Sequence, residues 1–132
     1  PDRIRALCRR GISVGADGVL FMESSKKAQV RLEHFNSDGS TSDFCGNGTR
    51  CAARYALQKV MAGRHMRIEI GRQVIDAVVA ADFQVSLRLA LPDPVRGPLA
   101  VKTPGGEFPG YCVTAGVPHL VIFVPDPGSI PV

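Results

Sequence analysis

Cys45 is the residue of this sequence best placed for chemistry, because it stands just before the expected start of a helix. It lies in the segment FCGNGTRC, residues 44–51, a glycine-rich turn that leads into helix-forming residues. In a helix that begins here, the first backbone N–H groups form the positive end of the helix dipole. That end favours a thiolate over a thiol, which would make Cys45 a base or nucleophile near neutral pH. The same N–H groups suit a carboxylate or a phosphate, and the glycines let a ligand approach the backbone closely.

Other roles for this segment stay open on the residues alone. A thiol at the start of a helix can be purely structural, and Gly-x-Gly is common in turns. A zinc site is disfavoured, because five residues separate Cys45 from Cys51, rather than the roughly two to four that zinc sites use. We expect Cys51 to face the core, as free cysteines usually do.

The elements that must position Cys45 are short strands and one long helix. The long helix is predicted over residues 48–62, with Gly63 as its stop. Its polar residues Arg50, Arg54 and Gln58 form a single stripe, so the helix is expected to be buried on most sides. Residues 2–10 are predicted to be the end of a short helix. About eight strands are predicted, at residues 19–22, 30–35, 66–70, 74–80, 85–91, 99–103, 111–114 and 119–124.

The predicted fold class is α+β, with about eight mostly antiparallel strands forming a curved sheet around one central helix. A length of 132 residues fits one domain. The composition is 45% hydrophobic and 21% charged, which excludes disorder. No apolar run approaches the roughly 18 residues of a membrane span, and the N-terminus is not a signal peptide.

The charge and the cysteine content indicate which binding partners and which cellular compartment to expect. The net charge is +4, but the basic residues are dispersed, Trp is absent and aromatic residues make 6%. This argues against a nucleic-acid partner and fits a small anionic substrate. The four scattered cysteines argue against a secreted disulfide scaffold, so a reducing cytoplasm is expected.

Three motifs, in this order, resemble the diaminopimelate epimerase family. They are GADGVL at residues 15–20, FNSDGS at 35–40 and CGNGTRC at 45–51. In addition, residues 116–119, GVPH, are similar to the family's Gly-Asn-Pro-His segment. The resemblance spans essentially the whole chain, and CGNGTRC is its most specific part. It implies an epimerase that interconverts LL- and meso-diaminopimelate in lysine and cell-wall precursor synthesis.

The resemblance also implies a mechanism and a set of site residues. The family works without pyridoxal phosphate or any other cofactor, with one cysteine from each of two halves facing the substrate's α-carbon. Cys45 would be one acid/base, and Gly46 and Asn47 would bind substrate through the loop backbone. Asn36 would hydrogen-bond the distal amino-acid end of the substrate, and His119 would tune the acidity of the cysteine pair. From the residues alone, Asn36 could equally shape a turn, and His119 could be a hydrogen-bonded histidine at the start of a strand.

The sequence departs from the family pattern in several places. Val117 stands where many relatives have a substrate-binding Asn, and Gly18 stands where some have a polar side chain. The second catalytic cysteine is missing, since neither Cys8 nor Cys112 lies in a glycine-rich loop. The family's N-terminal strand is missing as well. We therefore expect residues 1–132 to be an N-terminal domain that lacks its first strand and is inactive alone. Its C-terminal catalytic domain would be its partner outside this chain, and a homodimer stays open.

Two other functions compete with this interpretation. One is another cofactor-independent racemase of the same superfamily, of the proline or hydroxyproline type. The other is a non-catalytic fragment or binding module. No metal site is predicted. A Schiff base is not expected either, because none of the four lysines has a suggestive setting: Lys26, Lys27, Lys59 and Lys102.

Overall fold

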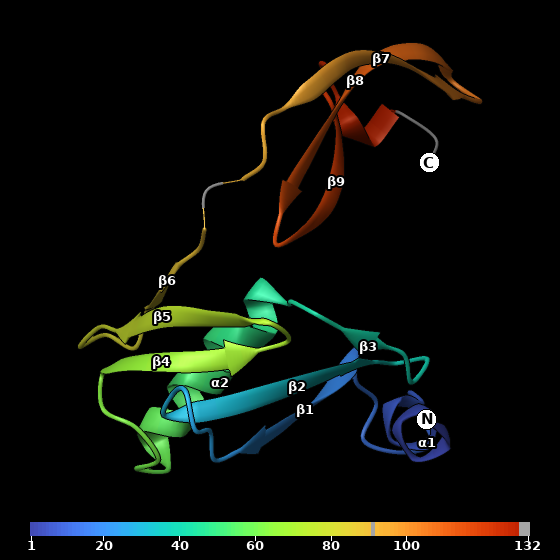
Figure 1. The fold of residues 1–132 in the computed structure, drawn as a ribbon. Helices are drawn as coiled ribbons and strands as arrows, with labels where there is room; N and C mark the ends of the chain where they lie inside the picture. The colour runs from blue at the N-terminus through green and yellow to red at the C-terminus, as the bar shows by residue number, and fades with distance from the viewer. Residues whose placement is uncertain (91, 130–132) are drawn as a thin grey trace. The chain divides into compact units, whose positions relative to one another are not determined.

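The computed structural model describes residues 1–90 and 92–129, and the chain forms two compact units, Pro1–Leu89 and Ala90–Val132 (Figure 1). The first unit contains α1 (Asp2–Cys8), β1 (Gly18–Glu23), β2 (Val30–Asn36), β3 (Thr41–Ser42), α2 (Gly46–Gln58), β4 (His65–Ile70), β5 (Gln73–Val79) and β6 (Val85–Arg88). The second contains β7 (Arg96–Thr103), β8 (Gly106–Ala115), β9 (Val117–Ile122) and the 3-10 turn η1 (Pro127–Ser129). The sequence predicts a single domain, whereas the contacts within the chain divide it into two.

The α+β fold with mostly antiparallel strands is confirmed. Every predicted strand is present, although Leu91, at the end of the strand predicted over 85–91, lies outside the described residues. One further strand, β3, is only two residues long and is too short to produce a periodic pattern. The strands form two separate sheets rather than one.

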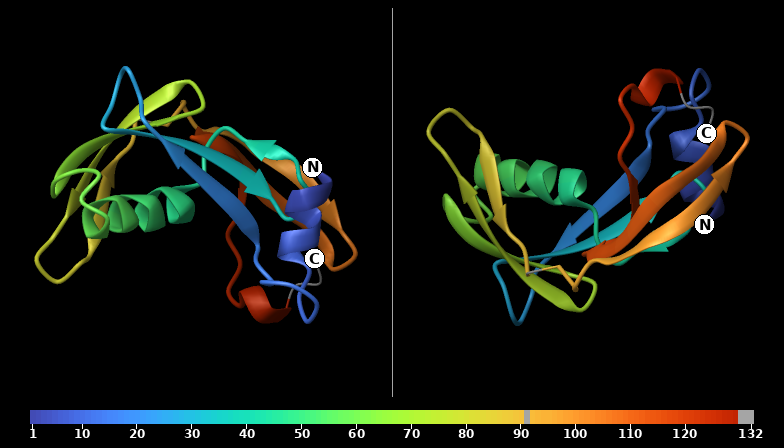
Figure 2. Two further views of the ribbon diagram at one scale, coloured as in Figure 1. Left: turned by 90° about the horizontal axis from the view of Figure 1, so that it is seen from below. Right: turned by 90° about the horizontal axis from the view of Figure 1, so that it is seen from above.

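The sheet of the first unit curves around α2. Its strand order is β1-β2-β4-β5-β6, with β3 paired to β2. All of its pairs are antiparallel except β2 with β4, which are parallel. Figure 2 shows α2 lying along the concave face of this sheet.

Small residues on one face of α2 make this packing close. Ala52, Ala53, Ala56 and Thr49 are buried against a sheet whose inward residues alternate with exposed ones. The largest of the fully buried side chains come from the strands: Leu32, Ile68, Ile70, Val30 and Val79. Because alanine has only a methyl group, the helix axis can lie near these branched side chains without a gap between them.

The opposite face of α2 is not covered by the first unit's sheet. Tyr55 is 50% exposed, and Cys51 is exposed rather than in the core. The predictions that the helix is buried on most sides and that Cys51 faces the core are therefore wrong. The polar stripe of Arg50, Arg54 and Gln58 lies on this uncovered side, with both arginines exposed, as predicted.

Helix α2 ends at Gln58, earlier than predicted, because Val60 takes over the role expected of Gly63. Val60 has φ 57°, in the left-handed region. The N–H of Val60 donates to the carbonyl of Leu57, and the N–H of Met61 donates to that of Ala56. This pair of hydrogen bonds is the Schellman motif, whose left-handed position is usually glycine.

In the second unit, three antiparallel strands form a meander in the order β7-β8-β9. Of its residues whose burial is described, only Gly110 is buried. Large apolar side chains such as Leu99, Leu120 and Phe123 are exposed. The described residues of this unit therefore contribute no hydrophobic core of their own. Across the described part of the whole chain, no helix has the length and apolar character required to cross a lipid bilayer.

Glu69 of β4 forms a hydrogen bond and an ion pair with the loop between β1 and β2. Its Oε2 accepts a 2.5 Å hydrogen bond from the Ser25 hydroxyl, and its Oε1 lies 3.5 Å from the Lys27 ammonium group. The hydrogen bond from Ser25, followed by the positive charges of Lys27 and Arg31, lowers the pKa of Glu69. The folded state therefore favours the carboxylate form of this group.

Replacing Val60 with glycine should stabilise the protein by about 1 kcal/mol, because a β-branched residue is strained at positive φ and glycine is not. The measurement is the free energy of unfolding from urea titrations. Lys59→Gly is the matched control, since Lys59 has φ −91°, and it should destabilise by roughly 0.5–1 kcal/mol. An equal effect of the two substitutions would contradict the left-handed conformation of Val60.

The stability contributed by Glu69 should depend on pH. Because its folded-state pKa is lowered, this stability is present above the unfolded pKa of about 4.3 and is lost as pH falls through the folded pKa. Thermal melts at pH 7 should show Glu69→Gln less stable than the wild type, with the difference shrinking below about pH 4. Glu33→Gln, which removes an exposed pair with Arg31, should have little effect at either pH. A difference between wild type and Glu69→Gln that is the same at both pH values would contradict this assignment.

Candidate active site

Cys45 is the N-cap residue of α2. Its backbone is extended, with φ −142° and ψ 104°, and its Sγ accepts a hydrogen bond of 3.3 Å from the N–H of Gly48. Its carbonyl oxygen accepts 2.8 Å hydrogen bonds from both the N–H and the hydroxyl of Thr49. The thiol thus takes the capping place that Ser, Thr, Asp or Asn usually fills. The helix begins directly after Cys45, so the predicted position of this thiol at a helix N-terminus is confirmed.

The glycine at position 48 allows the start of α2 to approach β1. A Cβ there would lie 3.1 Å from Cδ2 of Leu20 and 3.3 Å from Sγ of Cys45. At Gly46, by contrast, a Cβ would come no closer than 3.6 Å to its neighbours. Asn47 is exposed, and its Oδ1 accepts a hydrogen bond from the Arg50 guanidinium group. A side chain at position 48 would therefore require Leu20 or Cys45 to shift, whereas one at position 46 would not require its neighbours to move.

Asn36, the last residue of β2, begins a tightly bonded turn. Its N–H donates to the Ser40 carbonyl at 2.8 Å, and its Nδ2 donates to the Ser40 hydroxyl at 2.9 Å. The hydroxyl and the N–H of Ser40 both donate to Asp38, and these bonds, helped by the charge of Arg5, lower the pKa of the Asp38 carboxyl. Asn36 therefore does shape a turn. Its Oδ1 nevertheless has no hydrogen-bond partner among the described residues.

The structure places the predicted site residues in two groups. Cys45, Gly46 and Asn47 adjoin one another at the start of α2, and Asn36 lies in the same unit at the end of β2. His119 belongs to the second unit, where it is exposed on β9 and paired with Val113 of β8. With Cys112 and Arg96 it lines an open cavity of about 410 Å³.

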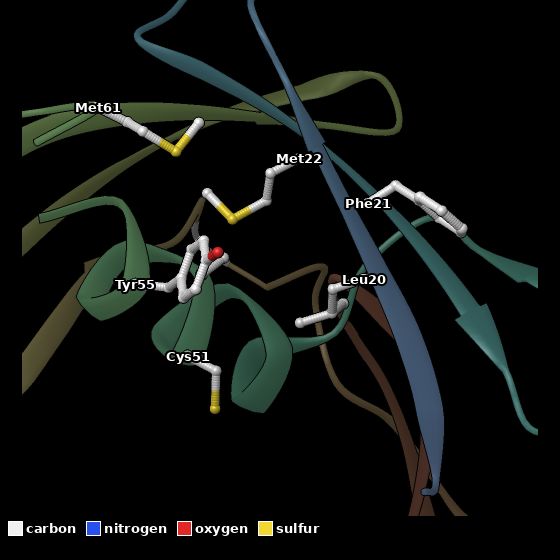
Figure 3. A pocket seen from close by; sticks show the side chains of 7 residues that line it. Leu20, Phe21, Met22, Cys51, Tyr55 and Met61 are labelled. Carbon is white, nitrogen blue, oxygen red and sulfur yellow. The ribbon is translucent and has the colours of Figure 1, made fainter. Parts of the chain in front are cut away.

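A second open cavity, of about 530 Å³, lies between β1 and α2. Leu20, Met22, Cys51, Tyr55 and Met61 contribute to its mostly apolar lining. Figure 3 shows Leu20 and Met22 directed from β1 towards the side of Tyr55. Cys45 is not among its lining residues.

Sequence reasoning missed the exposed position of Cys51. The sequence did contain a sign of this exposure. Cys51 and Tyr55 directly follow Arg50 and Arg54, so on a helix they lie beside the exposed polar stripe. All four cysteines are free, and within the described ranges no three His, Cys, Asp or Glu side chains are grouped to hold a metal ion.

Sequence comparison shows which family this chain belongs to. A family model described as "Diaminopimelate epimerase" matches residues 2–87, nearly the whole first unit. The chain belongs to the diaminopimelate epimerase family. The resemblance of the GADGVL, FNSDGS and CGNGTRC motifs to that family is thereby confirmed.

Relatives in the diaminopimelate epimerase family extend this match along the chain. The diaminopimelate epimerase of Archaeoglobus fulgidus is 37% identical over 135 residues, which cover 94% of this chain and 48% of the relative. That of a Hydrogenobaculum species is 38% identical over 125 residues, covering 93% and 45%. The chain thus spans about half the length of the curated relatives it matches.

A solved structure shares the fold. The phenazine biosynthesis protein of the PhzF family from Bacillus anthracis superposes with a TM-score of 0.67 at 17% sequence identity. The match covers 92% of this chain and 45% of that protein. This likeness supports the diaminopimelate epimerase-like α+β architecture.

Alkylation should distinguish the four thiols of this family member. At neutral pH a soft electrophile should modify Cys45 before the more exposed Cys51, because its Sγ lies beside the N–H of Gly48 at the helix N-terminus, a setting typical of reactive cysteines. Buried Cys8 should react last. Mass-spectrometric mapping after brief treatment gives the order, and the urea-unfolded chain, where the four rates should converge, is the control. Preferential labelling of Cys51 would contradict a reactive Cys45.

Proposed function

We propose that this chain supplies half of the active site of an enzyme that interconverts LL- and meso-diaminopimelate. The observation that carries this proposal is the thiol of Cys45 at the N-terminus of α2, with its Sγ bonded to the N–H of Gly48. The match of the diaminopimelate epimerase family model to residues 2–87 supports the choice of substrate.

Epimerisation by this route is a two-base proton transfer. The thiolate of one cysteine takes the proton from the substrate's α-carbon, and the electron pair of the C–H bond stays on the substrate, spread towards its carboxylate. A thiol on the opposite face then delivers a proton to the carbon, so the centre is inverted and no net proton is gained or lost. Cys45 serves as one member of this pair, and its partner comes from outside residues 1–132. No cofactor takes part.

The start of α2 would stabilise the charge that develops on the substrate. The N–H groups of Gly46 and Asn47 lie at the positive end of the helix, where they can bind the α-carboxylate as it gains negative charge. Such donors count most when they are fixed before the reaction. The close packing of Gly48 against Leu20 fixes the segment that carries them.

The remaining roles concern the distal end of the substrate and the cysteine pair. The Oδ1 of Asn36 is suited to accept a hydrogen bond from the distal ammonium group. His119, exposed on β9, would tune the acidity of the cysteines. Val117 has no polar group, so this chain would lack the contact that an Asn makes at that position in many relatives.

The division into two units favours a domain boundary near Leu89. The first unit has a hydrophobic core and contains all the residues matched by the family model, which ends at residue 87. The described residues of the second unit bury almost nothing. We propose that the first unit belongs to the N-terminal catalytic domain and that β7, β8 and β9 begin a second domain. The rest of that domain, with the second cysteine, would be the functional partner of this chain.

Cys45→Ala in the complete enzyme should lower the exchange of the α-proton of LL-diaminopimelate by about 10²–10⁴-fold, because one of the two acid/base groups is removed. Loss of the substrate's α-proton NMR signal in D₂O measures this exchange. Cys51→Ala is the matched control: it removes a thiol from the same helix six residues later and should leave the rate unchanged.

Residues 1–132 alone should not epimerise diaminopimelate, since inversion requires a second group on the opposite face of the carbon. Circular dichroism of an LL-diaminopimelate solution over time tests this. Turnover by this chain alone that is abolished by Cys45→Ala would show that the second base lies within residues 1–132. Unchanged exchange in the complete Cys45→Ala enzyme would overturn the proposed function itself.

A further inference from the structure

His34 is a polar residue at a position that the sheet would otherwise fill with an apolar side chain. It lies on β2, where the inward residues Val30 and Leu32 are each only 1% exposed. Because side chains alternate along a strand, His34 and Asn36 continue the same face. The Nδ1 atom of His34 is buried and has no hydrogen-bond partner within the described structure.

Stability does not account for a histidine here. A buried polar atom without a partner costs free energy, whereas an apolar side chain of similar size would extend the core made by Val30 and Leu32. A buried polar atom without a hydrogen-bond partner is an exception of the kind that is expected at functional sites. The neighbours of His34 indicate which function.

The ladder between β1 and β2 places His34 beside the proposed site. Its directly paired residue is Leu20, and Gly18 is paired with Asn36. Directly paired residues share one face of a sheet, so these four positions form one patch. Leu20 in turn lies against Gly48, which bonds the thiol of Cys45. The patch therefore joins Asn36 to the start of α2.

Gly18 provides the room that the imidazole of His34 uses. A Cβ at Gly18 would lie 3.0 Å from Nε2 of His34 and 2.5 Å from the carbonyl oxygen of Phe35. The second distance is too short for any side chain to be added without moving the backbone of β2. The imidazole thus leans over Gly18, and it is the polar group next to Asn36 on this face.

We propose that His34 is a specificity-determining residue that, together with Asn36, binds the distal amino-acid end of the substrate. This inference rests on the proposed function. A distal amino-acid end carries both an ammonium and a carboxylate group, so it needs both acceptors and donors. Asn36 offers an acceptor through Oδ1, and a neutral imidazole offers one N–H donor and one acceptor. Residues two apart on a strand have Cα atoms about 7 Å apart, which lets both side chains reach one such group.

The test compares His34→Leu and His34→Gln with the wild type in the complete enzyme. His34→Leu should raise the KM for LL-diaminopimelate about 3- to 10-fold, the effect of one lost hydrogen bond, and should change kcat by less than about twofold. His34→Gln, which keeps a donor and an acceptor, should recover part of the loss. Glu33→Gln, on the exposed face of the same strand, is the matched control and should leave KM unchanged.

A second substrate separates recognition from a structural role. With an α-amino acid of similar chain length that lacks the distal ammonium and carboxylate groups, His34→Leu and the wild type should have the same KM. Equal KM values for LL-diaminopimelate, or an equal rise of KM with both substrates, would overturn the assignment of His34. If Cys45→Ala abolishes exchange while His34→Leu is normal, only this inference fails. If Cys45→Ala is fully active, the proposed function fails first.

Discussion

The rest of the structure depends on the close approach of α2 to the concave face of the first unit's sheet. Ala53 and Ala56 are fully buried there and Ala52 nearly so. A larger side chain at any of these positions would lift the helix off the sheet, because interiors packed at crystal-like density have no spare volume. The same approach brings Gly48 against Leu20, and so holds the N-terminus of α2 in one place relative to β1. The position of the thiol of Cys45 results from that contact.

In this arrangement different residues provide the rigidity and the polar groups that an active site needs. The apolar residues of the sheet and the alanines of α2 supply rigidity through burial. The loop before α2 and the turn after β2 supply polar groups, and both are fixed by short hydrogen bonds to their own neighbours. Groups held in this way need little reorganisation when charge develops on a substrate. Of the residues proposed for the site, Cys45, Gly46, Asn47 and Asn36 thus lie in the unit that has a core, and His119 lies on β9 of the other unit.

Much of the first unit could be predicted from the sequence because its signals are periodic. In β4, Met66, Ile68 and Ile70 alternate with polar residues, and all three are buried. The start of α2 was also predictable, since a glycine-rich turn precedes a run of helix-forming residues. Its end was not, because Val60 adopts the left-handed conformation that sequence rules assign to glycine. A hydrogen bond between Met61 and Ala56 accompanies that conformation, and no local pattern reports it.

Features that depend on contacts distant in the sequence were the hardest to predict. Cys51 is exposed because the sheet covers only one face of α2, and its position beside the polar stripe was the one sign of this in the sequence. The division into two units was missed because residues 99–103, 111–114 and 119–124 are predicted as strands like the others, and their sequence does not show that they form a separate sheet. The proposed role of His34 could not be predicted from the sequence, because it depends on the absence of a side chain at Gly18 on the adjacent strand.

The capping of α2 by a thiol also bears on how this protein could be altered by selection. Sulfur is a weak hydrogen-bond acceptor, and Ser, Asp or Asn at an N-cap typically adds about 0.5–2 kcal/mol over residues that cap poorly. A library screened for thermal stability alone would therefore enrich Ser or Asp at position 45, and those variants would be more stable than their parent while losing the proposed acid/base group. At position 45 a residue that caps the helix better would increase stability, whereas the proposed proton transfer requires a thiol. If Cys45 is the proposed acid/base, its presence at the N-cap lowers the stability of the fold for the sake of catalysis.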